Sequence, residues 1–252
     1  MMRAKRSVMN AWRTAAIAVV ALSALSAASA QYPNLVQDPS FETTISDNNY
    51  GFNPTTWFAN QSFGGGAWQV ISGSIDLVRV PGFGGPPGPG NDQFVELNGN
   101  GPGAISQEVE VNEEGLYDFS FYYGGYAATA DGLNAADDYV LSARARILDS
   151  EGNEFLNAVV IWRIADAGGI NGSWIDMPYM AQVVLNAGTT YYVEFETLHF
   201  GGTDSNGNYI PDYFGPRIDS VNLSLVPEPA SMVALGAGLT GLLGLRRRRA
   251  RG

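Results

Sequence analysis

Oxygen-bearing side chains recur around a glycine in one short stretch of the sequence. They are Asp204, Asn206, Asn208 and Asp212. Carboxylate and amide oxygens spaced around a glycine are the groups that short calcium-binding loops wrap about the ion. The stretch lacks the glutamate at the twelfth position of an EF-hand, and strands are expected beside it instead of helices. Two interpretations follow, a calcium loop or an Asx-rich turn, and the turn requires fewer special features.

Residues that could catalyse a reaction are scarce. His199 is the single histidine, and a lone histidine is typically structural. The sequence holds no Gly-x-Ser-x-Gly elbow, no His-Glu-x-x-His helix and no phosphate-binding loop. A glycosidase needs only two carboxylates, but among 25 acidic residues a chance pair is uninformative. We therefore predict no catalytic residue and no enzymatic activity.

Aromatic rings are the residues that would stack on sugar rings. Trp57, Trp68, Trp162 and Trp174 are candidates, but aromatic residues at alternating positions of a strand mostly belong to the core. Trp174 follows the Gly/Asn-rich residues 168–173, where no alternation buries it. Trp174 is therefore the predicted ligand-binding residue.

Alternation of apolar and polar residues dominates positions 31–225 and predicts strands that bury one face each. The expected strands begin near residues 57, 68, 75, 94, 105, 117, 139, 155, 180, 191 and 218. Eleven strands with little helix are expected of an all-β, two-sheet jelly-roll sandwich. We therefore predict one β-sandwich domain at 31–225, a length that can bury a full core.

The charge of this predicted domain excludes one class of partner. Five arginines stand against 25 acidic residues between position 31 and Glu228, a net charge of roughly −20. Such a surface repels phosphate backbones, so we exclude DNA and RNA and favour cations or neutral polymers. The sequence has no cysteine, which excludes disulfides, thiol catalysis and thiolate metal sites.

The first 30 residues have the pattern of a signal peptide. Four basic residues precede an apolar run at 15–25, without an acidic residue. Ala28 and Ala30 provide the small side chains that signal peptidase accepts, which predicts cleavage before Gln31. The alternative is a retained transmembrane helix, but the run is shorter than the ~20 residues needed to cross the bilayer.

Residues 226–252 form a second targeting segment. Pro227, Glu228 and Pro229 precede the uncharged residues 230–245, which are followed by Arg246, Arg247, Arg248 and Arg249. As a helix, this uncharged stretch rises about 24 Å, a marginal length for a permanent span. Arginines stay on the cytoplasmic side, which predicts transient inner-membrane anchoring with the body outside. A plain C-terminal anchor is the alternative.

This tail resembles the PEP-CTERM sorting signal of Gram-negative bacteria, whose parts occur in the same order at the extreme C-terminus. The resemblance covers about 25 residues. It implies recognition by an exosortase, processing near the motif, and association with exopolysaccharide and biofilm.

The body resembles the choice-of-anchor C family, which is similar to galactose-binding-like, jelly-roll carbohydrate-binding modules. The resemblance rests on several segments in order: 34–42, 68–78, 95–99, 103–107, 119–125 and 215–221. An acidic insertion at 127–138 departs from the commoner form. Modules of this kind often hold a structural calcium where the first and last strands meet, and the matching residues are Glu42 and Asp219. The alternative is a solvated strand end or a bond to Arg217.

Together these features predict a non-catalytic, exported protein of the cell surface or extracellular matrix of a Gram-negative bacterium. Its expected partners are signal peptidase, an exosortase and extracellular polysaccharide, and its expected cofactor is a structural calcium ion. A secreted polysaccharide-active enzyme with an Asp/Glu pair and a purely structural surface protein are the alternatives.

Overall fold

The computed structural model of the chain describes residues 32–43, 55–79, 93–125, 138–163, 174–175, 178–203, 209–210 and 215–227. Asn34–Leu225 form one unit. The predicted signal peptide, most of the predicted tail, and Asp204, Asn206, Asn208 and Asp212 lie outside the described residues. No helix in the described ranges has the length and apolarity that a membrane crossing requires.

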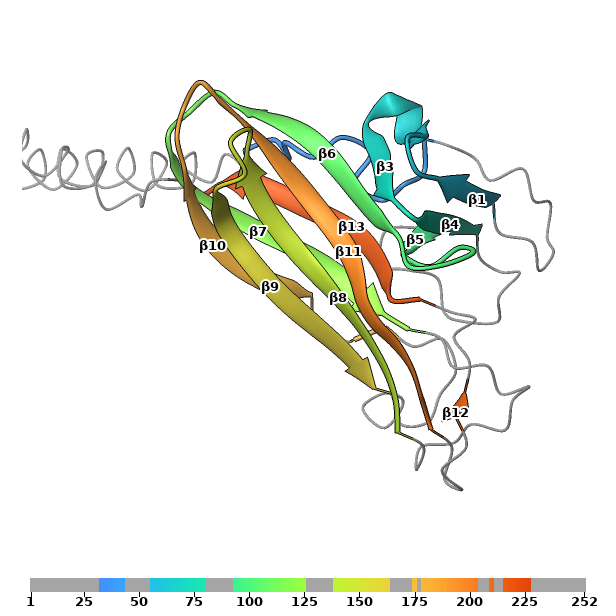
Figure 1. Ribbon diagram of the computed structural model, residues 1–252. Coiled ribbons are helices and arrows are strands. Elements are labelled where there is room, and N and C mark those ends of the chain that lie inside the picture. Colours follow the sequence, from blue (N-terminus) through green and yellow to red (C-terminus); the bar gives the residue numbers. More distant parts are fainter. Residues whose placement is uncertain are drawn as a thin grey trace, which may run out of the picture. The chain divides into compact units, whose positions relative to one another are not determined.

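Thirteen strands in the described residues form two antiparallel sheets (Figure 1). Sheet A has the order β1 (Thr55–Phe58), β4 (Ser74–Arg79), β5 (Gln93–Glu96), β13 (Arg217–Leu225), β7 (Gly115–Gly124) and β10 (Tyr179–Leu185). Sheet B has the order β2 (Ser62–Phe63), β3 (Trp68–Ser72), β6 (Ala104–Val111), β11 (Thr189–Thr203), β8 (Asp138–Asp149) and β9 (Glu154–Arg163), and β12 (Tyr209–Ile210) pairs with β11. A 3-10 turn at Gly64–Gly66 is the one helical element among these residues.

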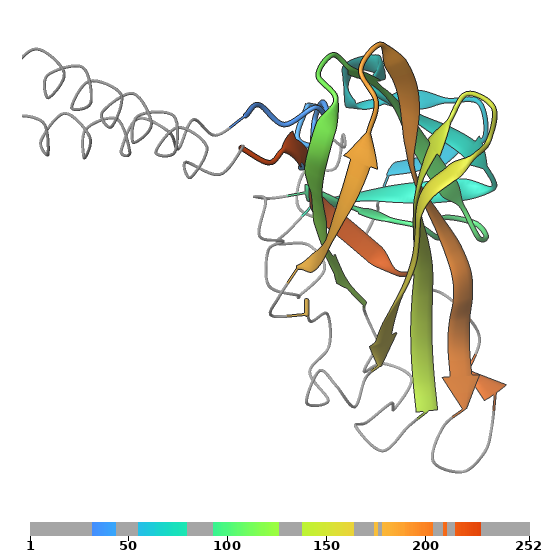
Figure 2. The ribbon, with the colours of Figure 1, turned by 90° about the vertical axis from the view of Figure 1, so that its left-hand side faces the viewer.

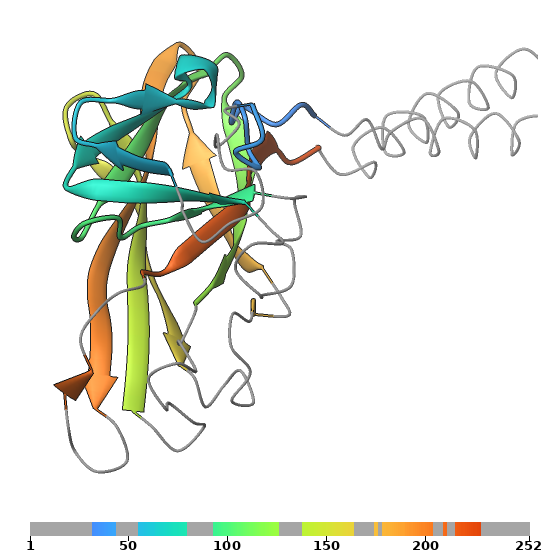
Figure 3. The same cartoon turned by 90° about the vertical axis from the view of Figure 1, so that its right-hand side faces the viewer.

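The all-β, two-sheet sandwich predicted from the alternation is confirmed. Each of the eleven predicted strands corresponds to an observed one, and only the two-residue strands β2 and β12 were not expected. Two residues cannot display a period of two, so the sequence pattern carries no signal for them. Figure 2 faces the side where β10 and β9 end the two sheets, and Figure 3 faces the opposite side.

Alternate side chains of the strands meet between the sheets and form the core. On β8 the inward side chains are fully buried, as predicted: Leu141, Ala143, Ala145 and Ile147. Phe121 of sheet A meets Phe195 of sheet B edge to face, with ring centroids 4.9 Å apart. Contacts of this kind join the two sheets through apolar burial.

The beginning of the body lies along its last strand. Leu35 N donates to the carbonyl oxygen of Leu223 at 2.8 Å, and Val221 N donates to that of Pro39 at 2.9 Å. The Asn34 side chain adds two bonds, donating to the Val221 carbonyl at 2.8 Å and accepting from Leu223 N at 2.9 Å. The first and last described segments are therefore joined, as the predicted calcium junction requires.

Candidate functional site

One row of backbone partners crosses sheet A. We call it the transverse row; its members are Thr56, Asp76, Glu96, Arg217, Gly124 and Trp174. The chain neighbours Ile75, Val95 and Ile218 are fully buried in the core. Since successive side chains of a strand point to opposite faces, the charged side chains of the row point to the outer face of sheet A.

The centre of the transverse row is a buried acid–arginine pair. Glu96 and Arg217 are 2% and 1% exposed, and Arg217 Nε lies 3.5 Å from Glu96 Oε2. The other carboxylate oxygen, Oε1, accepts a hydrogen bond from Gly215 N at 3.1 Å. Burial raises the pKa of Glu96 to about 7, although the Arg217 charge and the Gly215 bond act in the opposite direction.

A second carboxylate continues the row toward the edge of the sheet. Thr56 Oγ1 donates to Asp76 Oδ1 at 2.6 Å. Burial raises the pKa of Asp76, and the threonine bond opposes this shift. The carboxyl groups of Asp76 and Glu96, which are neighbours in the row, therefore bind protons more readily than the same side chains do in water.

Aromatic rings flank the buried pair. The Arg217 guanidinium carbon lies 4.6 Å from the centroid of the Phe94 ring, and Trp174 meets Phe94 edge to face at 5.4 Å. Ile175 N donates to the Tyr123 carbonyl at 3.1 Å, which fixes the backbone next to Trp174. Trp174 is half-buried, so the predicted ligand-binding ring combines an anchored position with a partly exposed surface.

The two residues of the predicted calcium junction lie on different segments, Glu42 on the first described segment and Asp219 on β13. Glu42 Oε1 accepts from Gln93 N at 2.7 Å, at the start of β5. Asp219 lies on β13, is fully buried, and accepts from Ser220 N at 2.6 Å through Oδ1. The alternative of a solvated strand end is therefore wrong for Asp219. The described ranges hold no group of three or more acidic or histidine side chains suited to a metal ion, and calcium binding stays a prediction.

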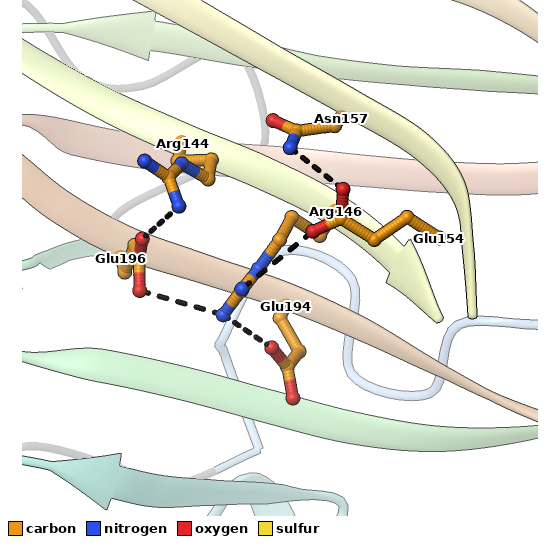
Figure 4. Close-up of polar contacts among 6 residues, drawn as sticks. All are labelled: Arg144, Arg146, Glu154, Asn157, Glu194 and Glu196. Atoms are coloured by element: carbon orange, nitrogen blue, oxygen red, sulfur yellow. Dashed lines mark hydrogen bonds and ion pairs between the residues drawn. The ribbon is translucent and has the colours of Figure 1, made fainter. Parts of the chain in front are cut away.

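The outer face of sheet B carries a separate network of charges (Figure 4). Arg146 Nη2 lies 2.9 Å from Glu194 Oε2 and 3.4 Å from Glu196 Oε2, and Arg144 Nη1 lies 3.1 Å from Glu196 Oε1. Glu154 completes the network: Arg146 Nη1 approaches it at 3.8 Å. Burial raises the pKa of Glu194, against the effect of the Arg146 charge. Because these charges satisfy one another across β8 and β11, the network supports strand pairing more than ligand binding.

The sequence pattern does not distinguish Asp76 or Glu96 from other outward-facing strand residues, and it offers Arg217 only as a partner for the predicted calcium junction. Glu96 lies between the apolar Val95 and Leu97, a pattern that shows it faces outward but not that it is covered. A weak signal was present, because Arg217 is one of only five arginines in an acidic body and opens the last strand.

Comparison with known proteins matches residues 225–249 to the PEP-CTERM protein-sorting motif. The match includes Pro227, Glu228, Pro229 and the arginines at 246–249, and it confirms that the tail carries this sorting motif. The motif marks an exported protein with a C-terminal sorting signal.

The chain is similar to several known proteins over part of its length. Halomucin of Haloquadratum walsbyi (strain DSM 16790 / HBSQ001) is 38% identical over 99 residues, which are 39% of this chain and 1% of halomucin. The chain therefore spans a very small part of that relative. Among solved structures, TmCBM61 in complex with β-1,4-galactotriose is 14% identical, with 77% of this chain and 99% of that chain covered and a TM-score of 0.42. A family 35 carbohydrate-binding module from Clostridium thermocellum is 15% identical, with 69% and 99% covered and a TM-score of 0.34.

Proposed function

We propose that this chain is an exported, non-catalytic protein of the cell surface or extracellular matrix that binds polysaccharide and is processed by an exosortase. The observation that carries the proposal is the combination of a C-terminal sorting motif with an anchored, partly exposed tryptophan beside a buried acid–arginine pair. A sorting motif directs the body to the outside, where polysaccharide is the abundant polymer. The partly exposed members of the transverse row, Thr56, Asp76 and Trp174, are the groups that could contact it.

The transverse row suits a sugar because one face of sheet A carries a partly exposed ring, Trp174, and two partly exposed polar side chains, Thr56 and Asp76, which are fixed by their mutual hydrogen bond. Trp174 presents part of its ring, and Phe94 holds that ring edge-on at 5.4 Å. Binding sites for small polar ligands combine such apolar surfaces with a few well-placed polar groups that set orientation. The body carries roughly 20 net negative charges, since it has five arginines against 25 acidic residues, so a neutral polysaccharide fits better than an acidic one.

Substitution of Trp174 tests the binding site. We expect Trp174→Ala to weaken retention of the protein on its host's exopolysaccharide at least about tenfold, which corresponds to ~1.4 kcal/mol, because the stacking surface is removed. Affinity electrophoresis or immobilised-polysaccharide binding would measure it. Tyr192→Ala is the matched control, since Tyr192 is a half-buried aromatic residue on β11 of sheet B, whereas Trp174 is bridged to Gly124 of sheet A.

Equal binding of the Trp174→Ala variant and the unaltered protein would remove Trp174 from the site. Incubation with the same exopolysaccharide separates binding from catalysis. Reproducible release of reducing ends, abolished by a single Asp or Glu substitution, would make the protein an enzyme and contradict the proposal. The mass of the protein isolated from its host would show whether the tail is cut near residues 227–229.

A further inference from the structure

The strand β10 is an unprotected edge of sheet A. Among the described residues it pairs only with β7, in an unbroken register from Tyr179 to Leu185. It contains no charged residue, no proline and no bulge, which are the features that normally protect an edge strand from pairing with another chain. Its outward side chains Met180 and Val184 are 67% and 59% exposed.

Exposed apolar side chains gather on the same side of the molecule. Five of the nine large apolar side chains that are exposed in the described residues lie on the edge strands β9 and β10: Phe155, Val159, Ile161, Met180 and Val184. A sixth, Leu116, is the direct partner of Val184 on β7. Figure 2 faces this side, where both sheets end. On sheet A, Met180, Val184 and Leu116 are exposed together at the edge, and a group of exposed apolar side chains typically marks an interaction surface.

The residue pattern of β10 is complementary to itself. In an antiparallel pair of two β10 strands centred on Gln182, position 180 of one copy faces position 184 of the other. Met180 would then contact Val184 of the second copy on the outer face, next to Leu116. The same register places Ala181 opposite Val183 on the inner face. In an antiparallel ladder, hydrogen-bonded and non-hydrogen-bonded residue pairs alternate along the strand. Backbone hydrogen bonds can therefore form between the two copies either at the Gln182 pair or at the pairs on both sides of it.

We propose that two copies of this chain associate through β10, antiparallel about a two-fold axis at Gln182, so that sheet A continues from one copy into the next. β10 carries no charged side chain, so the contact buries no charge of this strand. On β7, Asp118 lies opposite Gln182 and accepts a hydrogen bond from Gln182 Nε2 at 2.9 Å. The two Asp118 side chains would be separated by about three strand spacings, ~14 Å, which exceeds the screening length of ~8 Å at physiological salt.

Introducing a charge on the edge tests the contact. Sedimentation velocity on protein produced from the full-length chain in its own host should show a dimer for the unaltered protein. Val184→Lys should raise the dimer dissociation constant at least tenfold. Val159→Lys, which places the same charge at a 52% exposed position of the other edge strand, should leave the dimer intact. A monomeric unaltered protein, an intact Val184→Lys dimer, or equal loss in Val159→Lys would overturn the proposal.

Two further variants test the register. Adding Met180→Glu to Val184→Lys should restore the dimer, because positions 180 and 184 face each other across the axis. Since the chain has no cysteine, Gln182→Cys supplies a single thiol at the axis and should give a covalent dimer under mild oxidation. Gln69→Cys, exposed on β3 within sheet B, should form no covalent dimer under the same conditions. Equal cross-linking of the two cysteine variants, or no restoration by the added glutamate, would contradict the pairing.

Discussion

The Glu96 carboxyl group and the Arg217 guanidinium are almost completely withdrawn from water in the middle of sheet A. Taking a charge pair out of water costs several kcal/mol per ion, and the attraction between the charges only partly offsets that cost. Protonation of Glu96 relieves part of it, which is why burial raises the pKa of this group. The pair is therefore a position where stability depends on pH.

The stability of the protein should fall as pH rises from about 4.5 to about 7. In that interval native Glu96, with a pKa of about 7, retains a proton that the unfolded chain, with a pKa near 4.5, has released. The contribution is fully present below the unfolded pKa and is lost as pH passes the folded pKa, by up to about 3 kcal/mol. Urea denaturation at pH 4.5 and 7.5 would measure it.

Glu96→Gln should flatten this pH dependence, because the amide does not titrate. Glu108→Gln on β6, at an exposed position, should retain the slope of the unaltered protein. An unchanged slope in Glu96→Gln would show that the proton uptake belongs to other groups, of which Asp76 is the first candidate because burial raises its pKa as well.

Individual residues of the site were only partly predictable. Trp174 was singled out because no alternation buried it, and it is half-buried in the structure. Glu96 was missed because the alternating pattern assigns a residue to a face of its own strand and says nothing of what covers that face. Glu96 is buried on the outer face of sheet A by residues that are distant from it in the sequence, such as Gly215 and Arg217. A pattern within one strand contains no information about those residues.

At the level of single strands, the connection between β3 and β4 depends on one glycine. Only Gly73 separates β3, in sheet B, from β4, in sheet A, so the chain changes sheets within one residue. Gly73 has a φ of 58°, and a Cβ placed there would collide with the carbonyl oxygen of Pro102. This position therefore needs glycine for two reasons, backbone conformation and space.

Gly73→Ala should lower the free energy of unfolding by several kcal/mol, because left-handed strain of about 1–2 kcal/mol adds to the steric clash. Gly152→Ala is the matched control. Gly152 has a φ of 83° with nothing within 4 Å of an added Cβ, so only the conformational strain applies. Thermal unfolding of the two variants would separate the contributions. Similar melting temperatures would show that the Pro102 contact relaxes easily.

Strand positions were well predicted, whereas strand partners were not. Alternation located β4 and β5 from local residues alone. The pairing of β13 with β5 and β7 joins residues about a hundred positions apart, and β3 and β4 separate although they are adjacent in sequence. Which strands pair depends on how all strands pack around one core, so the sequence of a single strand does not predict its partners.

At the scale of the whole molecule, the first and last segments of the body are joined by hydrogen bonds, and each segment carries one of the predicted calcium residues. We expect calcium at one hundred times its dissociation constant to stabilise the protein by about 2.7 kcal/mol, through ligation by Glu42 and Asp219. Glu42→Gln keeps an acceptor for Gln93 N but removes the charge, and it should abolish the effect. Differential scanning calorimetry with calcium or EDTA would measure it, with Glu113→Gln on an exposed loop as control. Identical melting temperatures with and without EDTA would exclude the ion.

The position of β13 has a mechanical consequence for a protein attached through its C-terminus. The sorting segment follows directly from Leu225, the last residue of β13, and β13 has hydrogen-bonded partners on both sides in β5 and β7. Tension along that strand is shared by two ladders and by the bonds from Asn34 and Leu35, so they must rupture together instead of one after another. If the protein is held through this segment, a pull on its C-terminus therefore loads these hydrogen bonds in shear.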